Sequence, residues 1–83
     1  MTMQIKGQLQ LKWQNPGSKS EGVYAILLSE EGREWRLYRA NQLPLNDPYF
    51  EPYEGATLRL EGVEEENGYF RVEGLEVENE QTK

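Results

Sequence analysis

Apolar and polar residues alternate along most of this chain, in short runs that end at Gly, Pro, Asn or acidic residues. In the first run, Met3–Trp13, the residues Ile5, Leu9 and Trp13 fall on one side, while lysines and glutamines fall on the other. A period of two residues is typical of a strand with one buried face. Further runs with strand character follow at Val23–Ser29, Arg33–Ala40, Ala56–Glu65 and Tyr69–Glu78. The pattern therefore predicts five β-strands.

Three irregularities in this pattern predict how the strands curve. Gly7 interrupts the long first run, which predicts a bend or bulge where one strand pairs on both sides. The second run is apolar on both faces, so it is expected either to be covered on both sides or to lie where a barrel curves tightly. In the last run the apolar phase slips by one residue at Glu73-Gly74, which predicts a bulge at Gly74.

The segments between the runs carry turn signals. The polar stretch 14–22, with Asn15-Pro16-Gly17-Ser18 at its start, predicts an exposed loop. Glu30-Glu31-Gly32 and Asn67-Gly68 predict hairpin links, the latter as a two-residue turn.

The segment 41–55 contains three prolines, which exclude a long helix because each lacks an amide hydrogen and clashes with the preceding turn. One helical turn from Asp47 to Tyr53 remains, with Asp47 as its cap and Pro48 at the first position. Phe50 and Tyr53 are three residues apart and would share one face. The turn is therefore predicted to be a plug that closes one end of the fold.

Composition limits the possible chemistry. The 83 residues suit one domain, residues 1–78, followed by a polar flexible tail, residues 79–83. Cysteine and histidine are both absent, which excludes disulfides and thiolate zinc sites and removes the commonest general base. No apolar segment resembles a secretory signal or a membrane span, so a soluble cytoplasmic protein is expected. Oligomeric state is left open.

Charge is distributed unevenly. The net charge is −6, and residues 51–83 carry three basic and ten acidic residues, whereas residues 1–50 carry six basic and five acidic ones. An acidic surface repels phosphate groups, on which nucleic-acid affinity largely depends, and it repels anionic membranes. Nucleic acid is therefore a disfavoured partner, no membrane partner is expected, and another protein is the favoured partner.

Four local segments, Gly22–Leu28, Gly32–Leu37, Tyr53–Gly62 and Gly68–Val77, resemble small bacterial OB-fold domain proteins. The resemblance covers roughly residues 3–78. It implies an all-β fold: a five-stranded OB-type Greek-key barrel with a short helical turn between strands 3 and 4. Many OB-folds bind oligonucleotides or oligosaccharides on the strand 2–3 face. This sequence departs from that pattern because its connection between strands 4 and 5, Glu65–Gly68, is short and acidic.

The aromatic residues divide by phase. Large rings on the apolar phase are expected to fill the core; these are Trp13, Tyr24, Trp35 and Phe70. Tyr38 and Tyr69 lie on the polar phase. With the arginines of the outward phases they form a candidate ligand face: Arg36, Tyr38, Arg59, Tyr69 and Arg71. The favoured alternative is a plain solvated face, on which these arginines, Lys6 and Lys12 pair with Glu34, Glu61 and Glu73.

A second candidate surface lies in the proline-rich segment, where Tyr49, Phe50 and Tyr53 would contact a protein partner. The favoured alternative for this segment is the plug described above. Glu64–Glu66 lacks the spacing of a calcium loop and is interpreted as a solvated turn, so no metal site is predicted. No catalytic constellation is recognised, and neither an enzyme nor a cofactor is expected. The leading hypothesis is a non-enzymatic binding or adaptor domain that contacts another protein. The alternative is single-stranded nucleic-acid or oligosaccharide binding on the strand 2–3 face.

Overall fold

The computed structural model describes residues 2–19 and 21–78, and the predicted tail at 79–83 lies outside them. The strands are β1 (Met3–Gln14), β2 (Gly22–Ser29), β3 (Glu34–Arg39), β4 (Thr57–Glu64) and β5 (Tyr69–Val77). Two short 3-10 helices complete the fold, η1 (Pro48–Tyr53) between β3 and β4, and η2 (Glu66–Gly68) between β4 and β5. The predictions of five strands and of a helical turn between the third and fourth are confirmed.

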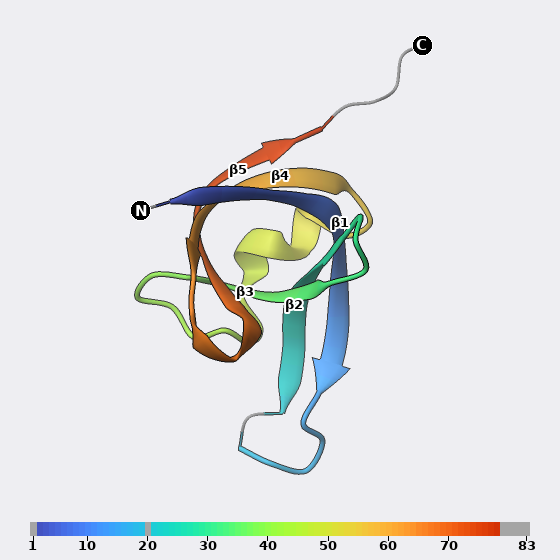
Figure 1. Ribbon diagram of the computed structural model, residues 1–83. Helices are drawn as coiled ribbons and strands as arrows, with labels where there is room; N and C mark the ends of the chain where they lie inside the picture. The colour runs from blue at the N-terminus through green and yellow to red at the C-terminus, as the bar shows by residue number, and fades with distance from the viewer. Residues whose placement is uncertain (1, 20, 79–83) are drawn as a thin grey trace.

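The strands form a closed ring in the order β1-β2-β3-β5-β4 (Figure 1). β1 closes the ring because it pairs antiparallel with β4 over Met3–Gln8 and with β2 over Gly7–Gln14. Gly7 belongs to both ladders, as its position in the sequence predicted. A side-chain carbon at Gly7 would overlap the carbonyl oxygen of Leu28, so the close approach of β2 requires glycine there.

β5 carries the predicted irregularity beside Gly74. Glu61 on β4 is opposite Gly74, whereas the next residue, Gly62, is opposite Val72. Glu73 is therefore an extra residue on β5. Such a bulge increases the local twist and helps a small sheet to close on itself.

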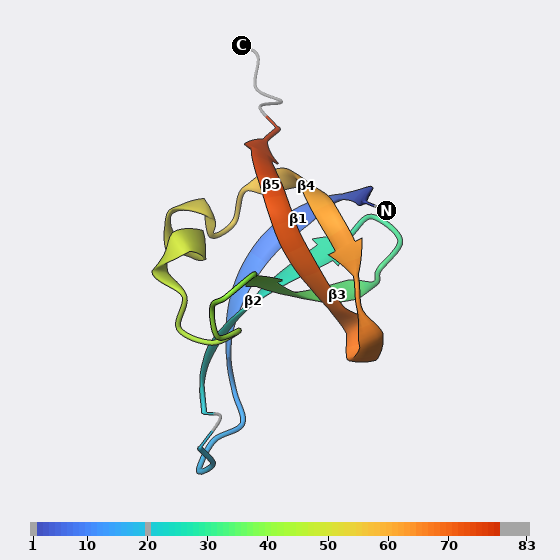
Figure 2. The ribbon, with the colours of Figure 1, turned by 90° about the vertical axis from the view of Figure 1, so that its left-hand side faces the viewer.

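The core lies inside the ring, and η1 covers one of its ends. Figure 1 shows η1 across the opening of the ring, and Figure 2 shows it on one side of the strands. Phe50 is only 1% exposed and Tyr53 packs against the same core, so the predicted plug is confirmed. Asp47 caps η1 by accepting a hydrogen bond from the backbone amide of Tyr49, and Pro48 follows it as predicted. Trp35 and Phe70 meet edge to face inside the ring, with centroids 5.4 Å apart.

β2 is covered on both faces, as predicted. Ala25 and Leu27 belong to the main core, whereas Tyr24 and Ile26, on the alternate positions, are buried outside that cluster. Tyr24 also forms a β-bridge with Leu45, which brings the segment after β3 against the outside of β2. Tyr24 is therefore buried, as predicted, but under the loop that covers the outer face of this strand and not in the main cluster.

Trp13 also differs from its predicted place in the core, because 61% of its surface is exposed. β1 pairs with β4 only as far as Gln8, while its pairing with β2 continues to Gln14. The ends of β1 and β2 thus form a ribbon that projects beyond the ring, as both views show (Figures 1 and 2). Trp13 lies on this ribbon, past the point where another strand could cover it.

The connection between β4 and β5 is not the predicted two-residue hairpin. It is the 3-10 helix η2, and the amide of Glu65 donates to the carbonyl of Tyr69 across its base. This connection brings the Glu65 side chain to Tyr38 on β3 and Arg71 on β5. Among the described residues, no helix has the length and apolar character needed to cross a membrane.

Candidate functional site

The parallel pairing of β3 with β5 assembles four of the five residues of the candidate ligand face. Arg36 is opposite Tyr69, and Tyr38 is opposite Arg71. Their neighbours along each strand point into the core; these are Trp35, Leu37, Phe70 and Val72. The alternation within each strand therefore turns Arg36, Tyr38, Tyr69 and Arg71 to the outside of the ring.

The two tyrosines lie against each other. Their ring centroids are 6.0 Å apart and their planes are nearly perpendicular, at 89°. This edge-to-face arrangement is a favourable one for aromatic pairs. The guanidinium carbon of Arg36 lies 5.7 Å from the centroid of Tyr69, within the range of a cation–π contact. Tyr38 and Tyr69 therefore pack against each other, and Tyr69 also packs against Arg36.

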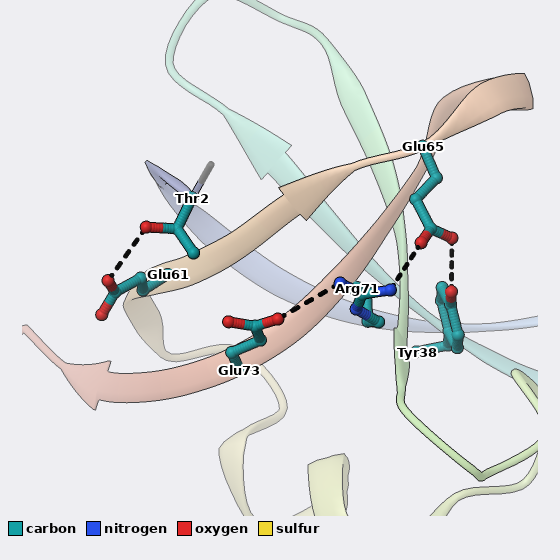
Figure 3. A network of polar contacts seen from close by, with 6 residues as sticks. All are labelled: Thr2, Tyr38, Glu61, Glu65, Arg71 and Glu73. Atoms are coloured by element: carbon teal, nitrogen blue, oxygen red, sulfur yellow. Dashed lines mark hydrogen bonds and ion pairs between the residues drawn. The ribbon is translucent and has the colours of Figure 1, made fainter.

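Glu65 holds Tyr38 and Arg71 together, as Figure 3 shows. The Tyr38 hydroxyl donates to one carboxylate oxygen of Glu65, and Nη1 of Arg71 donates to the other at 3.1 Å. The second terminal nitrogen of Arg71 donates to Glu73 at 3.3 Å. The hydrogen bond to Glu65 raises the pKa of Tyr38 above its ordinary value, because it stabilises the neutral phenol. Tyr38 is thus fixed in its rotamer by a charged acceptor.

A groove of about 670 Å³ opens beside these rings. Its lining comes from two stretches of the chain: Tyr38, Gln42 and Pro44 in and after β3, and Glu65, Glu66 and Tyr69 between β4 and the start of β5. We call this surface the tyrosine groove. Its volume falls within the usual range of ligand pockets in proteins, and its walls combine apolar rings with a few polar groups.

Arg59, the fifth residue of the candidate ligand face, does not line the tyrosine groove. It lies on β4, where its terminal nitrogens approach Glu76 at 3.7 Å and Glu78 at 2.6 Å. Conversely, Gln42 and Pro44 were not predicted to line a site. The sequence places both residues in a loop between strands and gives no sign of a site there. They line the groove because this loop folds back against β2, where Leu45 pairs with Tyr24.

Most outward cations on the strands have acidic partners, as the alternative interpretation predicted. Lys12 pairs with Glu34 at 3.1 Å and Arg71 with Glu73 at 3.3 Å. Glu61 differs from the prediction, since its described polar contact is a hydrogen bond from the Thr2 hydroxyl (Figure 3). Within the described part of the chain, Arg36 has no carboxylate at ion-pair distance. One arginine beside the groove therefore keeps its charge uncompensated.

The second candidate surface is mostly used for folding. Phe50 is buried, so it does not belong to a surface, and Tyr53 is half-buried. Tyr49 is 37% exposed, but the Arg39 guanidinium lies over its ring at 4.3 Å. Arg39 also donates two hydrogen bonds of 2.9 Å to Asp47, and these lower the pKa of the Asp47 carboxyl below its usual value. Only Tyr49 remains available to a partner there.

The residues that the structure describes contain no group of three or more carboxylates placed to hold a metal ion. The polar groups of the tyrosine groove are two phenols, one amide and two carboxylates, which suit hydrogen bonding and attraction of cations. Comparison with protein-family models, curated proteins and solved structures finds no match to this chain. The tyrosine groove is therefore interpreted from its own geometry.

Proposed function

We propose that the protein is a non-enzymatic binding module, built on an OB-type barrel, that holds a segment of another protein in the tyrosine groove. The strand order, the double pairing of β1 and the parallel pairing of β3 with β5 support an OB-type topology. The position of η1, between β3 and β4 and across one end of the ring, supports it further.

The observation that carries the binding proposal is the pair of outward tyrosines beside a groove, with one ring locked by Glu65. Outward tyrosines give a partner a large contact area at low entropic cost, because few rotatable bonds are fixed on binding. A locked ring reduces that cost again.

The charges favour a protein over single-stranded nucleic acid. Nucleic-acid binders combine stacking rings with cations that remain free to reach phosphates. Here Arg71 is neutralised by Glu65 and Glu73, and Arg59 lies on another part of the surface. Arg36 is left as the one arginine of the candidate ligand face without a carboxylate partner among the described residues, and it does not line the groove. Glu65 and Glu66 line the tyrosine groove itself and would repel a phosphate backbone.

The test is a random peptide library selected on the intact protein, followed by amide-shift mapping of the selected peptides at physiological salt. We expect saturable shifts at Tyr38, Gln42, Glu66 and Tyr69, and loss of binding in Tyr69→Ala. Trp13→Ala is the matched control, because it removes an exposed ring outside the groove and should bind as the wild type does. The proposal is overturned if selection yields no peptide for this surface, or if oligo-dT or a short glycan saturates it instead.

A further inference from the structure

We infer that the segment bound in the tyrosine groove is basic and contains prolines in an extended polyproline II conformation. The inference rests on the proposed function and names its ligand class. Three features of the groove lead to it: the way its strands are paired, the rings that line it, and the charge of its lining residues.

Strand pairing limits how a partner backbone can bind. β3 and β5 pair with each other over Arg36–Arg39 and Tyr69–Val72, and β5 also pairs with β4 on its other side. The groove therefore lies over the face of a completed ladder, and β5 has no free edge there for a partner strand to extend. Recognition through the outward side chains of this face favours a segment that needs no ladder of backbone hydrogen bonds. A polyproline II helix has this property.

The half-buried rings that line the groove suit proline. Tyr38 and Tyr69 stand nearly perpendicular to each other, with Pro44 on the same groove, so they present flat apolar surfaces at an angle. Grooves lined with aromatic rings are the usual docking sites of proline-rich segments, whose conformation is already formed before binding. Glu65 also holds the Tyr38 ring in place, so the ring and the proline segment would both have their bound conformation before they meet. This lowers the entropic cost of binding.

Among the residues that line the groove, the unpaired charge is negative; Arg36 contacts the Tyr69 ring but is not a lining residue. Glu66 is exposed, and among the described residues no cation lies at ion-pair distance from it. Glu65, beside it, already accepts from Tyr38 and Arg71. A lysine or arginine of the partner would therefore meet Glu66, and the excess of acids in residues 51–83 would favour the approach of a basic segment.

Synthetic peptides can test the ligand class directly. A short peptide of Arg-Pro-Pro repeats is titrated into the isotope-labelled protein, beside one with glutamate in place of arginine and one with alanine in place of proline. We expect the first peptide to saturate the amide shifts of Tyr38, Gln42, Glu66 and Tyr69. Each substituted peptide should bind at least roughly tenfold more weakly, which corresponds to about 1.4 kcal/mol.

Two variants separate the charge from the rings. Glu66→Gln should weaken the Arg-Pro-Pro peptide several-fold while leaving a Gln-Pro-Pro peptide unaffected. Glu31→Gln is the matched control, since it removes the same charge from an exposed turn outside the groove and should change neither. Tyr69→Ala should weaken both peptides.

The outcomes distinguish this inference from the proposed function. If library-selected peptides saturate the tyrosine groove but carry no prolines or basic residues, the module binds proteins and the inference about the ligand class is wrong. Equal binding of the Arg-Pro-Pro peptide and its alanine or glutamate counterpart also contradicts the inference. If no peptide of any kind binds the groove, both the inference and the proposed function fail.

Discussion

Asp47 joins the cap of η1 to the strand β3. Its side chain is 5% exposed and accepts hydrogen bonds from Arg39 and from the amide of Tyr49. We expect Asp47→Ala to lower the free energy of unfolding by about 1 kcal/mol at neutral pH, the usual cost of deleting a helix-capping side chain. Glu51→Ala, at an exposed position of the same helix, is the control and should have little effect.

The same residue gives stability a dependence on acid. The hydrogen bonds from Arg39 lower the pKa of folded Asp47, so the unfolded chain binds its proton more readily. This stabilisation is complete above the unfolded pKa of about 3.9 and is lost as the pH falls through the lower folded value. Urea unfolding from neutral to acidic pH should therefore show the gap between wild type and Asp47→Ala closing below about pH 4. A gap of constant size would contradict this assignment.

Tyr38 is expected to make the stability of the fold depend on pH in the alkaline range. Its hydrogen bond to Glu65 raises its pKa, so the stabilisation is fully present below the unfolded pKa of about 10 and is lost as the pH rises through the folded value. Ultraviolet titration of the five tyrosines should show a late-ionising component in the wild type. That component should be absent in Tyr38→Phe and shifted towards lower pH in Glu65→Gln. Persistence of the late-ionising component in Tyr38→Phe, or an unchanged curve in Glu65→Gln, would contradict the contact.

At the scale of strands, the bulge between β4 and β5 leaves no room for a side chain at Gly62 but leaves room for one at Gly74. A side-chain carbon at Gly62 would overlap the carbonyl oxygen of Arg71, whereas one at Gly74 would meet Glu61 at 3.7 Å, an ordinary contact. We expect Gly62→Ala to destabilise the fold by about 3 kcal/mol or to prevent folding, because backbone must move. Gly74→Ala should remain folded with a small change in thermal unfolding temperature. Similar losses in both variants would contradict the register.

The strand periodicity could be read from the sequence because it is a local property, fixed by side chains on alternate faces. The bulge also left a local signal, the slip at Glu73-Gly74. How far each strand is covered is not local. Trp13 has the same phase as Leu9, yet Leu9 is buried and Trp13 is exposed, because β4 is paired with only the first part of β1. The same limit applies to the groove, whose Gln42 and Pro44 depend on the path of a loop.

The two tryptophans both lie on the apolar side of their strands, and they test whether a neighbouring element covers that side. Trp35 is 4% exposed inside the ring, whereas Trp13 is 61% exposed on the ribbon. We expect Trp35→Ala to cost about 3–5 kcal/mol of stability, as for other large residues removed from a core. Trp13→Ala should cost less than about 1 kcal/mol, as is usual for surface substitutions. Chemical denaturation followed by tyrosine fluorescence would measure both, and a large loss for Trp13→Ala would show that the ribbon is covered.

For the molecule as a whole, the central question is whether net charge or the local charge of the groove excludes nucleic acid. We expect the wild type, with its net charge of −6, not to bind oligo-dT at physiological salt. Glu66→Lys and Glu31→Lys each change that net charge to −4, but only the first adds a cation to the lining of the groove that Tyr38 and Tyr69 share.

If the groove charge is decisive, Glu66→Lys gains measurable oligo-dT binding at low salt, with stacking on the tyrosines, and Glu31→Lys does not. Fluorescence anisotropy of labelled oligo-dT at two salt concentrations would measure this, and the gained affinity should fall as salt rises. Equal gains in both variants would mean that overall charge governs binding. Saturable binding by the wild type at physiological salt would instead favour a nucleic-acid ligand for this face.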